Sequence, residues 1–194
     1  MQQLGNGLYA AEHYEDALSV QEAELAMERR VGADENSILA TQTNLANSYA
    51  TMGRLEEASQ MERNIYSGRV KLQGDEHPDT LVAALNYSSS LAALERFKEA
   101  QSLLRKTIPV ARRVLGESNE QTLQMRWIYA RTLYEPDVAT LGDIREAVST
   151  LEDAGRIARR VLGSAHPNAA GIEGELEEAR AALRARETQS SARP

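Results

Sequence analysis

An internal repeat limits the folds open to this chain more than any other feature of its sequence. Gly32, Gly74, Gly116 and Gly163 stand in related surroundings and are 42, 42 and 47 residues apart. Three of them end near-identical segments: Arg29-Arg30-Val31-Gly32, Arg112-Arg113-Val114-Leu115-Gly116 and Arg159-Arg160-Val161-Leu162-Gly163. A period of this length predicts one supersecondary unit stacked on copies of itself.

The pattern of residues in each repeat predicts two helices joined by a tight turn. Leu45 and Tyr49 have helical spacing and precede a turn at Gly53, and a second helix begins near Leu55. The arginine pairs suit the negative end of that second helix, and the following glycine predicts a left-handed helix cap. Pro78 and its later counterpart Pro167 fit the first turn of the next helix, where no N–H is needed.

The last repeat is longer because five residues are inserted within 134–143. We expect Pro136 to end the first helix of that repeat early. Asp143 followed by Glu146 predicts a capping box that starts the second helix. Residues 167–187 predict a capping helix with a polar outer face, and residues 188–194 predict a disordered tail.

The segment Leu45-Ala46, Tyr49 and Gly53-Arg54-Leu55-Glu56-Glu57-Ala58 resembles the tetratricopeptide repeat (TPR) signature. The 42-residue period, with Gly74-Asp75-Glu76-His77-Pro78-Asp79-Thr80-Leu81 between units, is similar to the longer TPR variant of kinesin light chains. The resemblance implies an all-α, TPR-like α-solenoid, a right-handed superhelix of antiparallel helix pairs with a C-terminal capping helix. A single array over residues 1–187 would then contain units of about 1–32, 33–74, 75–116 and 117–163, with the capping helix at 167–187. Because the first unit lacks half of its first helix, we expect a fragment of a longer array.

The same resemblance implies a ligand groove, since the first helices of TPR arrays line a concave surface that binds peptides. Carrying the groove positions over gives eight candidates: Asn6, Thr43, Asn44, Asn47, Asn86, Ser89, Trp127 and Arg131. Side-chain amides in such a groove can pair with an extended peptide backbone without demanding a charge. The alternatives are a solvated surface for each asparagine, a packing role for Trp127 against the last helix, and an ion pair for Arg131.

Composition and motifs exclude several other classes of function. A net charge of −7 and a pI of about 5.1 argue against partners that are nucleic acids or anionic membranes. The chain has no cysteine, and its histidines (His13, His77 and His166) lack metal-ligand spacing. Two of them recur in His-Pro turns, where a turn or N-cap role is expected. Neither a phosphate-binding loop nor a nucleophile elbow is present, so we expect no catalytic, cofactor or metal site.

The sequence therefore favours a protein–protein interaction scaffold that is not an enzyme and binds a peptide or protein in the concave groove. The alternative is an architectural or oligomerising segment of a larger kinesin-light-chain-like multidomain protein, with homodimers formed through solenoid ends. The absence of cysteine, of a signal sequence and of an apolar run of ~20 residues favours a cytoplasmic protein.

Overall fold

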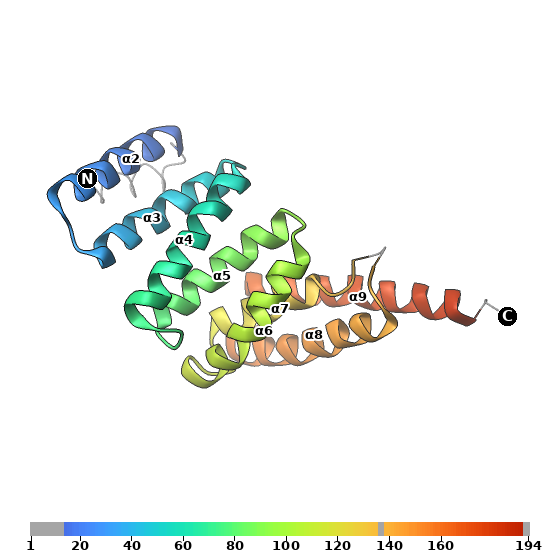
Figure 1. The fold of residues 1–194 in the computed structure, drawn as a ribbon. Coiled ribbons are helices and arrows are strands. Elements are labelled where there is room, and N and C mark those ends of the chain that lie inside the picture. Colours follow the sequence, from blue (N-terminus) through green and yellow to red (C-terminus); the bar gives the residue numbers. More distant parts are fainter. Residues whose placement is uncertain (1–13, 136–137, 192–194) are drawn as a thin grey trace. The chain divides into compact units, whose positions relative to one another are not determined.

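The computed structural model describes residues 14–135 and 138–191, and within these ranges the chain is helical and has no strand. The chain divides into two compact units, Met1–Leu94 and Glu95–Pro194. The first unit contains α2 (Tyr14–Val31), α3 (Glu35–Thr51), α4 (Leu55–Gln73) and α5 (Pro78–Ala93). The second unit contains α6 (Phe97–Val114), α7 (Glu120–Arg131), α8 (Leu141–Leu162) and α9 (Pro167–Ser191) (Figure 1). The predicted alternation of first and second helices is confirmed from α2 onward.

The repeat glycines mark the ends of α2, α4, α6 and α8, and all four have positive φ, from +69° to +96°. At two of them the prediction of a left-handed helical cap is wrong, because their ψ angles are not those of a left-handed helix. Gly74 (φ 84°, ψ 169°) and Gly163 (φ 87°, ψ 156°) lie in an extended, positive-φ region that only glycine adopts. The backbone leaves each helix extended, so the chain reaches the N-cap of the next helix within a few residues.

The histidines of the His-Pro turns are N-caps, as predicted. His77 Nδ1 accepts a hydrogen bond from the backbone N–H of Asp79 at 3.2 Å. His166 Nδ1 makes the same bond with the N–H of Asn168, also at 3.2 Å. Both rings therefore satisfy a helix N-terminus that would otherwise lack a hydrogen-bond partner.

In the last repeat and the capping helix, the structure differs from the prediction at two helix ends. The capping box of α8 consists of Thr140 and Asp143, not of Asp143 and Glu146, because the Thr140 hydroxyl accepts from the Asp143 N–H at 3.1 Å and the Asp143 carboxylate accepts from the Thr140 N–H at 2.9 Å. Helix α9 continues to Ser191, past the predicted end at residue 187. No residue between 188 and 191 breaks a helix, and the Thr188 hydroxyl bonds the Arg184 carbonyl at 2.9 Å. Helix α7 does end early, at Arg131, whereas Pro136 lies outside the described residues.

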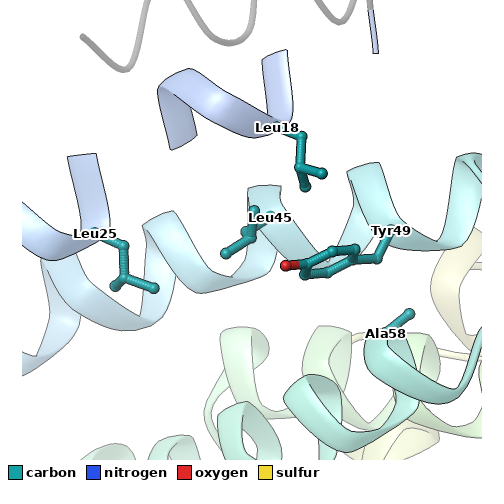
Figure 2. Close-up of a cluster of buried hydrophobic side chains, with 5 residues drawn as sticks. All are labelled: Leu18, Leu25, Leu45, Tyr49 and Ala58. Carbon is teal, nitrogen blue, oxygen red and sulfur yellow. The ribbon is translucent and has the colours of Figure 1, made fainter. Parts of the chain in front are cut away.

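The core of the first unit joins α2, α3 and α4 through Leu18, Leu25, Leu45, Tyr49 and Ala58 (Figure 2). The Tyr49 hydroxyl donates to Glu22 Oε1 at 2.9 Å, and the Arg54 guanidinium lies 4.3 Å from the Tyr49 ring centroid. A second cluster, of Leu39, Ala46, Ile65 and Ala83, joins α3, α4 and α5. The fully buried Ala58 lets α4 approach the other two helices closely.

In the second unit α8 and α9 run side by side, and α7 packs against both (Figure 1). Trp127 of α7 lies against α9 at Gly171, where a Cβ would come within 2.2 Å of Trp127 Cη2. The Trp127 Nε1–H donates to Glu175 Oε2 at 2.9 Å, and the Tyr134 hydroxyl donates to Glu175 Oε1. The indole is thus a packing element between α7 and α9.

Candidate functional site

A cavity of about 450 Å³ lies in the first unit between α3, α4 and α5. The first helices of two consecutive pairs, α3 and α5, supply most of its lining, and α4 adds three buried residues. The lining residues are Asn36, Ala40, Thr43, Asn44, Ala46, Glu62, Ile65, Arg69, Asp79, Val82, Ala83 and Asn86. Its volume is within the range of small-ligand sites.

Three of the predicted groove residues, Thr43, Asn44 and Asn86, meet in this cavity and are half-buried there. The Thr43 hydroxyl donates to the carbonyl of Leu39 in its own helix at 2.8 Å, so its hydrogen is not available to another group. The side-chain amides of Asn44 and Asn86 make no hydrogen bond to any residue in the described part of the chain. These two amides therefore remain available to a ligand.

The other candidates lie elsewhere. Asn47 and Ser89 are exposed on α3 and α5 and do not line the cavity. Trp127 and Arg131 belong to the second unit, where Trp127 packs against α9 and Arg131 is exposed beside Tyr134. Asn6 lies outside the described residues.

The cavity also contains a buried carboxyl group that the sequence reasoning missed. Glu62 is only 4% exposed, and its Oε2 finds no hydrogen-bond partner among the described residues. Burial raises the Glu62 pKa to about 7, and a hydrogen bond from Ser90 opposes the shift. At the same place in the other second helices stand Gln21, Leu104 and Leu151. The repeat packs well without an ionisable group at this position.

Arg69, like Glu62, is a buried ionisable residue of α4. Its side chain is 8% exposed, and its Nη1 donates to Asn36 Oδ1 and lies 3.4 Å from Asp79 Oδ2. The counterpart residues in α6 and α8 are Ala111 and Ala158, both fully buried. A comparison between repeats could have identified Glu62 and Arg69 from sequence, because Glu62 places a charge where its counterparts carry none, and Arg69 places a charge where α6 and α8 have alanine.

Two smaller cavities lie in the second unit. One of about 280 Å³ is formed by α6, α7 and α8 and contains three arginines. The other, of about 330 Å³, is lined by Arg131, Tyr134, Glu175 and Glu178 among others. Within residues 14–135 and 138–191, no group of three histidine, aspartate or glutamate side chains could hold a metal ion. None of the helices described is long and apolar enough to cross a bilayer.

Comparison with known proteins places this region in a known repeat type. Residues 37–113, which contain most of α3 and α6 and all of α4 and α5, match the tetratricopeptide repeat family model. No curated protein sequence matches the chain.

Solved structures share the fold over nearly the whole chain. Two crystal structures of a proposed kinesin light chain of Podosopora anserina with nearly identical TPR-like repeats are 24% identical, with TM-scores of 0.78 and 0.76. Each alignment covers 97% of this chain, and 87% or 88% of the other. BtubC (BKLC) from P. vanneervenii is 16% identical, with a TM-score of 0.70, and the alignment covers 97% of this chain and 78% of that one. The all-α, TPR-like fold is thereby confirmed.

Proposed function

We propose that this chain, a tetratricopeptide repeat protein with the fold of kinesin-light-chain-like arrays, binds an extended segment of a protein partner in the cavity between α3, α4 and α5. The observation that carries the proposal is the pair of unbonded amides of Asn44 and Asn86. They come from the first helices of two consecutive repeats and line one cavity.

The chemistry of the cavity suits a peptide. Each amide offers a carbonyl oxygen and an NH₂ group, which match the N–H and C=O of one peptide unit. Ala40, Val82 and Ile65 provide apolar surface for a side chain between the two amides. The carboxyl of Glu62 and the guanidinium of Arg69 add polar groups that distinguish one ligand side chain from another.

The test starts from peptides selected on the wild-type protein from a random display library. Their affinities are then compared for a double variant, Asn44→Ala with Asn86→Ala, and for a control, Asn64→Ala. Asn64 is an exposed asparagine of α4 that does not line the cavity. We expect the double variant to lose at least about tenfold in affinity, because hydrogen bonds of ~1 kcal/mol are removed at two positions. The control should bind as the wild type does, and thermal melts of all three should agree.

Equal binding by the double variant, or failure to select any peptide, would contradict this proposal. It would favour the alternative function as an architectural or oligomerising segment, in which contacts through the ends of the array form a homodimer. We also propose that the chain acts in the cytoplasm as a binding protein and not as an enzyme. Its lack of cysteine and the absence of a catalytic motif from its sequence support that assignment.

A further inference from the structure

The cavity in the second unit has a different chemistry from the one in the first. It has a volume of about 280 Å³ and lies between the second helix α6, the first helix α7 and the second helix α8. Its polar lining consists of Arg105 and Arg112 from α6, Arg126 and Tyr129 from α7, and Ser149, Thr150 and Asp153 from α8. Three guanidinium groups and one carboxylate therefore share this space in a chain whose overall charge is −7.

Arg126 is the least solvated of the three arginines. The residue is 7% exposed, and its Nη1 is buried with no hydrogen-bond partner among the described residues. Its Nη2 donates to the Thr150 carbonyl at 3.4 Å and lies 3.9 Å from Asp153 Oδ2. Burial, followed by repulsion from Arg112, lowers the pKa of the Arg126 guanidinium. A buried cation with an unsatisfied N–H is destabilising until an anion reaches it.

The repeat does not require an arginine at this position. The counterpart of Arg126 in α5 is Ala84, which is fully buried, and the counterpart in α3 is the half-buried Gln42. The helix pair therefore packs with a methyl group where α7 carries a guanidinium. A role in helix packing alone does not account for the arginine.

The other two arginines are exposed, and their hydrogen bonds use only some of their N–H donors. Arg105 Nε donates to the Tyr129 hydroxyl at 2.9 Å, and Arg112 donates to Glu117 Oε1 both from Nε, at 3.1 Å, and from Nη2. Each guanidinium carries five N–H donors, so donors remain on both after these bonds. Asp153 partly neutralises the cavity, and Glu117 pairs with Arg112 at its edge. The Asp153 side chain is 52% exposed and also pairs with Arg156.

We infer that this cavity binds a phosphoryl group, carried by a phosphorylated side chain of a protein or present as free phosphate. A phosphoryl group presents three terminal oxygens in different directions, whereas a carboxylate presents two in one plane. Guanidinium groups of α6 and α7 and hydroxyl groups of α8 approach the cavity from three helices. Arginine forks match phosphate oxygens.

Asp153 then acts as the competitor of the ligand. Its carboxylate is 3.9 Å from Arg126 Nη2, and it would repel a bound dianion. Removing the charge of Asp153 should therefore strengthen binding, while removing Arg126 should weaken it. These opposite effects distinguish a specific phosphate-binding site from nonspecific attraction of phosphate to a basic surface.

The test titrates the purified chain with inorganic phosphate at constant ionic strength and follows binding by calorimetry and by NMR chemical shifts. Arg126→Ala, which installs the counterpart residue, should weaken binding at least tenfold. Asp153→Asn should strengthen it at least threefold. The control Arg145→Ala removes one charge from an exposed arginine of α8 that pairs with Glu187, and it should change the affinity by less than twofold.

A second arm distinguishes the sources of the phosphoryl group. A short phosphoserine peptide and its unphosphorylated form are compared with inorganic phosphate. Tighter binding of the phosphopeptide assigns the site to a phosphorylated protein, and equal binding assigns it to free phosphate. No binding of phosphate or phosphopeptide, or equal losses in the Arg126 and Arg145 variants, would overturn the inference. Should the Arg126 variant unfold, an unchanged affinity in Asp153→Asn would overturn it as well.

Discussion

The buried carboxyl group of Glu62 makes the stability of the first unit depend on pH in a specific way. Burial raises its pKa from the ordinary value of 4.5 to about 7. Between pH 4.5 and 7 the folded chain keeps this proton while the unfolded chain releases it, so the free energy of unfolding falls as the pH rises. At ~1.4 kcal/mol for each pH unit, the stability lost across this window is about 3 kcal/mol. Above pH 7 the loss is complete, and below pH 4.5 it vanishes.

The variant Glu62→Gln removes the ionisation and keeps the shape of the side chain. The counterpart Gln21 already accepts a hydrogen bond from Ser48 at 2.7 Å, so a glutamine fits opposite a serine in this fold. We expect the variant to be more stable than the wild type by about 3 kcal/mol at pH 8, and equal to it at pH 4.

Urea denaturation at several pH values between 4 and 8 measures the difference directly. The control Glu56→Gln changes an exposed glutamate of the same helix and should leave the pH dependence of the wild type unchanged. Parallel stability curves for the wild type and Glu62→Gln would refute the reasoning, since they would show that Glu62 ionises equally in the folded and unfolded chains.

Four further predictions concern single backbone and packing positions, each checked by thermal or urea denaturation. Glu95 has a φ of 57°, and Glu95→Gly should stabilise the chain by about 1 kcal/mol because glycine adopts this conformation without strain. Thr140→Ala removes the capping box of α8 and should destabilise it by about 1 kcal/mol. Gly171→Ala should destabilise by about 1–3 kcal/mol, because its Cβ would meet Trp127 at 2.2 Å. Gly174→Ala, in the same helix with nothing within 4 Å, should instead stabilise by roughly 0.5–1 kcal/mol.

Comparison between repeats offers a general route to such sites. Ala111 and Ala158 show what the second helix needs at the position of Arg69, and Ala84 shows what the first helix needs at the position of Arg126. The charged residues at these positions add an unfavourable burial that packing does not require. The sequence contains this signal once the repeats are aligned, although the side-chain burial that makes it meaningful comes from the structure.

The helices of the fold and most of their ends follow from local sequence patterns. Repeat glycines, His-Pro turns and helical spacing act within a few residues of themselves, so the helix pairs and most of their ends could be predicted. The prediction failed at two helix ends. Two capping signals compete at the start of α8, where Thr140 and Asp143 form the capping box in place of Asp143 and Glu146, and α9 continues past residue 187 because no residue there breaks the helix.

The packing of distant helices determines which of the predicted groove residues share a cavity and which of them contact another helix. Asn44 and Asn86 share a cavity because α3 and α5 both pack against α4, whereas Trp127 packs against α9 at Gly171. The raised pKa of Glu62 and the unpaired Nη1 of Arg126 likewise arise from neighbours that are distant in sequence. Burial and the loss of water depend on every element packed around a group, and no local pattern of residues carries that information.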